Sequence, residues 1–70
     1  MDAEGLTRHL NKSGFRARYD AYEHATKVFV SEIILSDVED MLRVEGFKTR
    51  KTPAGKVGSV SQYLVSAWAW

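Results

Sequence analysis

Residues 36–50 read SDVEDMLRVEGFKTR, and this stretch decides the fold because one periodicity replaces another within it. Up to Glu45 the apolar residues recur at helical spacing. Gly46 can end a helix because glycine enters the left-handed conformation without a Cβ penalty. From Phe47 to Thr52 the period becomes two, which is typical of a strand. The stretch therefore predicts a helix that ends at Gly46 and a strand that follows at once. The helix positions expected to face inward are Val38, Met41 and Leu42.

The start of this helix carries the signature of a capping box. Ser36 lies three residues before Glu39, so its hydroxyl is placed to accept a hydrogen bond from the Glu39 amide. The Glu39 carboxylate can in turn accept from the Ser36 amide. We therefore expect Ser36 to be the N-cap.

A similar arrangement occurs 32 residues earlier, where Gly14 corresponds to Gly46. We expect a first helix over Asp2 to Lys12, a strand over Phe15 to Ala21 and a second strand over Lys27 to Ile34. An internal repeat of residues 6–30 and 38–62 is one interpretation. The other is that any helix ended by glycine before an amphipathic strand gives this likeness. The matched pairs are Leu6 with Val38, Leu10 with Leu42, Phe15 with Phe47, Arg16 with Lys48, and Arg18 with Arg50.

The segment after residue 52 is less regular. Pro53-Ala54-Gly55 predicts a turn. From Val57 to Trp70 the chain fits either a strand or a helix, and its valine, tyrosine and tryptophan content favours a strand. In that strand we expect Trp68 to pack under a helix.

Together these elements predict a single α+β domain over residues 1–70. The expected order is α-β-β-α-β-β, and the simplest packing is a four-stranded antiparallel sheet with both helices on one face. Because the chain begins with Met1 and shows no tag or tail, we expect a complete small protein.

Composition argues against several classes of function. The chain has no cysteine, which excludes disulfides and zinc-thiolate sites. His9 and His24 do not stand at metal-ligand spacing, and no nucleophile or phosphate-loop motif is present. No apolar run approaches the roughly 20 residues of a membrane helix. We therefore expect a cytoplasmic, non-enzymatic protein without a cofactor or metal.

Charge is unevenly distributed along the chain. Residues 1–45 hold six bases and nine acids (6 − 9 = −3), whereas residues 46–70 hold four bases and no acid (+4). If the two strands that follow the glycines share one sheet, their basic residues share its uncovered face. Basic residues interleaved with aromatics on a sheet are used by single-strand-binding proteins, although a solvated sheet face also displays such residues. The candidate partner-binding residues are Arg16, Arg18, Lys48, Arg50, Lys51 and Trp70.

Three functions remain open at this point. The first is a stand-alone binding protein, of the phage or mobile-element accessory type, that docks on a nucleic-acid-handling machine and modulates or inhibits it. The second is a domain that binds nucleic acid directly through the basic sheet face. The third is a structural homo-oligomer, such as a homodimer, joined through its C-terminal strand.

Overall fold

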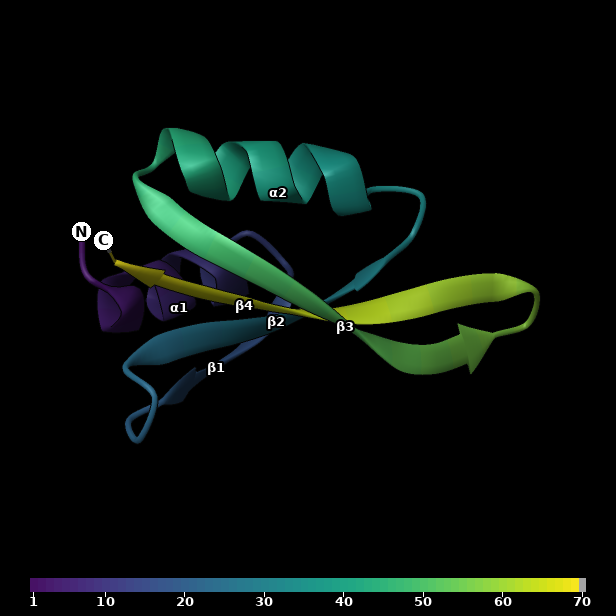
Figure 1. Ribbon diagram of the computed structural model, residues 1–70, viewed down its shortest axis with the longest axis horizontal. Helices are drawn as coiled ribbons and strands as arrows, with labels where there is room; N and C mark the ends of the chain where they lie inside the picture. Colours follow the sequence, from purple (N-terminus) through teal and green to yellow (C-terminus); the bar gives the residue numbers. More distant parts are fainter. Residues whose placement is uncertain (70) are drawn as a thin grey trace.

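The computed structural model describes residues 1–69, in which two helices and four strands form one α+β unit (Figure 1). The strands make a single sheet in the order β1-β2-β4-β3, and every neighbouring pair is antiparallel. The predicted fold class and element order are confirmed. The elements are α1 (Ala3–Lys12), β1 (Arg16–Asp20), β2 (Ala25–Ser31), α2 (Leu35–Val44), β3 (Phe47–Val57) and β4 (Val60–Ala69).

Both helices cover the same face of the sheet, as the sequence predicts. Val28 of β2 and Val65 of β4 pair directly across the two central strands, and both are fully buried. Leu6 and Leu10 of α1, together with Leu42 of α2, belong to the same buried cluster. We call this side of the sheet the helix face and the opposite side the open face. Burial of the apolar positions on the helix face leaves the alternate positions of every strand on the open face.

Polar groups fix α1 to the sheet. The Asp2 carboxylate caps the helix by accepting from the Gly5 amide at 2.7 Å. At the other end, the Asn11 side chain makes two 2.9 Å hydrogen bonds with the backbone of Ala17 in β1. Between them, the buried hydroxyls of Thr7 and Thr26 lie 2.6 Å apart and link the helix to β2.

The predicted N-cap of α2 is wrong. The helix begins at Leu35, its N-cap is Ile34, and no side chain caps it. Leu35 is buried beside Val38, so an earlier start adds a residue to the inward stripe. Burial of Leu35 therefore decides the start of the helix, and Ser36 lies exposed in its first turn.

The predicted turn at Pro53 is also wrong, because β3 continues through it to Val57 and the turn lies at Gly58 and Ser59. Proline is tolerated in β3 since this is an edge strand. The pairing with β4 shifts register between Pro53 and Lys56, where Gly55 has φ +99°. A β-bulge of this kind favours glycine at the positive φ. The resulting β3–β4 hairpin extends past α2 as an exposed arm (Figure 1).

The C-terminal segment is a strand, so the preferred interpretation is confirmed. The placement of Trp68 under a helix is wrong. Trp68 pairs with Ala25 and Lys48 on the open face, where it is half-buried. Residues 63–68 of β4 are paired with β2 on one side and with β3 on the other, so this part of the strand has no free edge.

The internal repeat is not confirmed. A shift of 32 residues moves the bounds of α1, 3 and 12, onto those of α2, 35 and 44. The same shift moves β2 onto residues 57–63, whereas β4 spans Val60–Ala69. Both helices are thus followed by a hairpin, but the second strands do not correspond.

Candidate binding face

Three cross-strand rows of side chains make up the centre of the open face. The middle row contains three cations, and the rows on either side of it contain the large aromatic rings. The middle row is Arg18, Lys27, Ser66 and Arg50. The row toward the chain termini is Asp20, Ala25, Trp68 and Lys48. The row toward the hairpin arm is Arg16, Phe29, Leu64 and Thr52.

The structure brings four of the six predicted partner-binding residues together on this face: Arg16, Arg18, Lys48 and Arg50. Lys51 does not join them. It pairs with Val65 on the helix face, where its ammonium lies 4.0 Å from the Glu39 carboxylate and 5.9 Å from the centre of the Tyr63 ring. Trp70 lies outside the described residues.

Lys27 is the central cation of the face, and two acids neutralise it. Its ammonium lies 2.9 Å from Glu23 and 3.5 Å from Asp20. The hydrogen bond with Glu23 raises the pKa of Lys27. The pKa of Asp20 is lowered, chiefly by the hydrogen bond from the Glu23 amide. Five cations and these two acids give the face a formal charge of 5 − 2 = +3.

The two edge strands carry the arginines of the middle row. Within residues 1–69, neither Arg18 nor Arg50 forms an ion pair, and both are exposed. Arg16 lies with its guanidinium 6.0 Å from the centre of the Phe29 ring, at the outer limit of a cation–π contact. Phe29 remains 45% exposed, so the ring has a free surface for a ligand.

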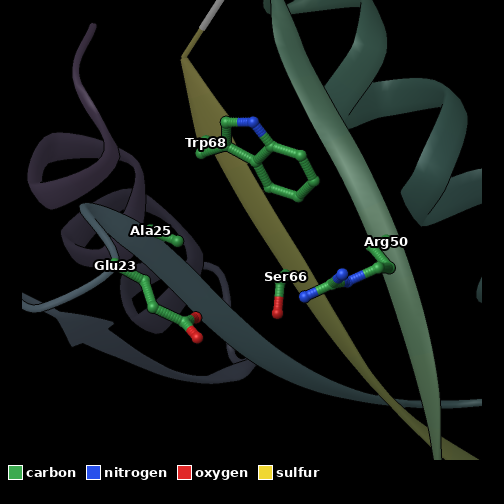
Figure 2. A pocket seen from close by; sticks show the side chains of 5 residues that line it. All are labelled: Glu23, Ala25, Arg50, Ser66 and Trp68. Carbon is green, nitrogen blue, oxygen red and sulfur yellow. The ribbon is translucent and has the colours of Figure 1, made fainter.

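A shallow hollow of about 340 Å³ opens between the middle row and Trp68. Figure 2 shows the Trp68 ring on one side and the Arg50 guanidinium reaching over β4 toward the Ser66 hydroxyl. Glu23, from the turn between β1 and β2, stands on the opposite side of the hollow from Arg50 (Figure 2). The buried Ala25 adds only a methyl group to the floor, which keeps the hollow open. The arrangement can hold a flat, polar ring.

Sequence reasoning missed Lys27, Phe29 and Trp68 as members of this face. The signal for the first two was present, because Val28 and Val30 are consecutive members of one apolar side and the residues between them must face the other way. For Trp68 the same rule, counted from Val65 and Ala67, predicts the open face. The size of the ring had suggested a core position instead.

Other site types are not found in the described chain. Across residues 1–69, no group of three or more histidine and acidic side chains could hold a metal ion. In the same range, no helix has the length and apolar character needed to cross a bilayer. No protein-family model, curated protein or solved structure significantly matches the chain.

Proposed function

We propose that this protein binds single-stranded nucleic acid through its open face. The observation that carries the proposal is the alternation of rows, in which cations lie between the exposed ring of Phe29 and the half-buried ring of Trp68. Cations neutralise phosphates, and aromatic side chains stack bases without strong sequence preference. A sheet face that carries aromatic side chains can receive the splayed bases of a single strand.

The dimensions of the face suit a short stretch of a strand. Arg18 and Arg50 lie on opposite edge strands, three strand spacings or about 14 Å apart. Phe29 and Trp68 lie on the central strands, on opposite sides of the cation row. A strand crossing the sheet can therefore contact cations at both edges while its bases face the two rings.

Fluorescence anisotropy with a labelled single-stranded 12-mer of thymidine tests the proposal. Four phosphate contacts give a log–log salt slope of about −2.8, which is about a 50-fold loss of affinity between 50 and 200 mM salt. A duplex of the same length should bind more weakly, since its bases cannot reach the rings. Absence of binding to the single strand at 50 mM salt contradicts the proposal.

A charge-matched pair of variants separates the face from net charge. Reversal of Arg16, Arg18, Lys48 and Arg50 to glutamate lowers the formal charge from +1 to −7 (1 − 8) and should abolish binding. Reversal of four cations off the open face gives the same net charge and should reduce binding far less. Those control residues are Arg8, Lys12, Lys51 and Lys56. Equal losses in two folded variants would show that the face has no special role.

Docking on a larger nucleic-acid-handling protein is the second candidate. It is favoured by Tyr22, which is 94% exposed in the turn between β1 and β2, because aromatic residues are enriched in protein interfaces. A pull-down that survives nuclease and 500 mM salt would favour this function. Phosphate-driven binding falls steeply with salt, whereas a largely apolar protein interface responds little.

A further inference from the structure

The hollow beside Trp68 has chemistry that can select one base. Its floor is formed by the short side chains of Ala25 and Ser66, and its wall by the half-buried indole ring. We propose that this hollow is a guanine-selective base site. The inference rests on the proposed function, because it names the base that a bound single strand places there.

The polar groups on the two sides of the hollow have opposite hydrogen-bonding character. Glu23, on the side of the β1–β2 turn, offers carboxylate oxygens that accept hydrogen bonds, whereas Arg50 only donates them. Lys27 contacts Oε2 of Glu23 at 2.9 Å. Each carboxylate oxygen can accept more than one hydrogen bond, so the group keeps acceptor capacity for a ligand. The hollow thus presents acceptors on one side and donors on the other.

Guanine matches this order of groups around its ring. Its N1–H and N2 amino group are adjacent donors, and its O6 and N7 are adjacent acceptors. A carboxylate can accept from the two donors, while an arginine can donate to O6 and N7, the commonest specific contact of arginine with a base. Adenine places an acceptor at N1, opposite the carboxylate, and thymine and uracil offer only one N–H between two carbonyls. Cytosine offers one amino group and no second donor.

The carboxylate of Glu23 is held in place before any ligand binds. Asp20 Oδ1 accepts from the amides of Tyr22 and Glu23 at 2.9 and 3.1 Å, which fixes the turn that carries Glu23. The ion pair with Lys27 then holds the Glu23 carboxylate above the open face of the sheet. A group that is positioned in the free protein loses less freedom on binding, so its contribution to selectivity is larger.

Three oligonucleotides of otherwise identical sequence test the selectivity. Each is an 11-mer of thymidine with one central guanine, hypoxanthine or adenine. We expect the guanine oligonucleotide to bind about 10-fold more tightly than the adenine one. Hypoxanthine lacks the N2 amino group and should fall between them.

Two variants assign the preference to Glu23. Glu23→Gln replaces one acceptor with a donor and should bring the guanine and adenine affinities within about twofold of each other. Glu32→Gln is the matched control, because it removes the same charge from an exposed residue that does not line the hollow, and it should retain the preference. Loss of the preference in both variants would overturn the assignment to Glu23.

Tryptophan fluorescence gives an independent measurement. The chain has two tryptophans, so Trp70→Phe leaves Trp68 as the only indole. Its emission should be quenched more by the guanine oligonucleotide than by the adenine one at equal saturation. If all three oligonucleotides bind equally, the guanine site is refuted and the proposed function stands. If none binds, both are refuted.

Discussion

Replacing the hydroxyl of Thr7 with a methyl group should cost more stability than the same change at Thr26, although the two groups touch each other. Thr7 Oγ1 lies 2.8 Å from the Ala3 carbonyl and 2.6 Å from Thr26 Oγ1. One hydroxyl proton can serve only one acceptor. We assign the Thr7 proton to the Ala3 carbonyl, because Thr26 can then donate to Thr7 across 2.6 Å instead of to the Arg18 carbonyl across 3.4 Å. Thr26 has just one other acceptor, the Arg18 carbonyl, at 3.4 Å.

The magnitudes follow from which group is left unpaired. In Thr26→Val, the Thr7 hydroxyl keeps its bond to Ala3, and the loss is one net hydrogen bond, about 1 kcal/mol. In Thr7→Val, the fully buried Thr26 hydroxyl keeps only a long contact, which costs about 2 kcal/mol. The double variant leaves neither orphaned and should cost no more than Thr7→Val alone.

Urea and thermal unfolding followed by circular dichroism measure all four proteins. In a domain of this size 1 kcal/mol corresponds to a shift of about 4–8 °C in Tm. Equal costs for the two single variants, or costs that add within about 0.5 kcal/mol in the double variant, would refute the assigned direction of the hydrogen bonds.

Five further changes have expected outcomes. Trp68→Ala should cost about 1–2 kcal/mol in urea unfolding, below the 3–5 kcal/mol of a fully buried tryptophan, because one side of the ring faces solvent. Ser36→Ala should leave Tm unchanged, whereas Asp2→Ala removes an observed cap and should cost about 1 kcal/mol. Gly55→Ala forces a side chain onto φ +99° and should lower stability by about 1 kcal/mol or more, measured by Tm. The pKa of Asp20 is lowered in the folded protein, so its carboxylate stabilises the fold above the ordinary pKa of 3.8, and this stabilisation is lost on acidification. Asp20→Asn should therefore flatten the pH dependence of the free energy of unfolding below about pH 4.

Local periodicity was sufficient to predict four of the five cations on the open face. In FRARYD the apolar residues alternate with arginines, so burial of the apolar set places the arginines on the open side. In FKTRKT burial of Phe47 places Lys48 and Arg50 on the open side. Arg16, Arg18, Lys48 and Arg50 follow from this rule alone, without knowledge of how the strands are ordered.

Features that depend on distant pairings could not be predicted in this way. The hollow needs Glu23 from the first hairpin and Arg50 from the second, and their approach depends on the pairing of β2 with β4. Nothing local specifies that pairing. The prediction of where α2 begins was wrong for a related reason. The capping signal at Ser36 is local, whereas the burial of Leu35, which sets the start of the helix, depends on the whole fold.

The position of β2 and β4 at the centre of the sheet divides the protein into two interdependent halves. Val28 and Val65, which pair across these strands, are 65 − 28 = 37 residues apart in the sequence. The turn at residues 32–34, between β2 and α2, separates the first helix and hairpin from the second. A cut in that turn leaves each fragment with one helix, one hairpin and an exposed apolar strand edge. Arg16, Arg18 and Lys27 then belong to one fragment, and Lys48 and Arg50 to the other. The complete set of open-face cations is therefore assembled only when the two fragments associate, so fragment complementation reports on the pairing of β2 with β4.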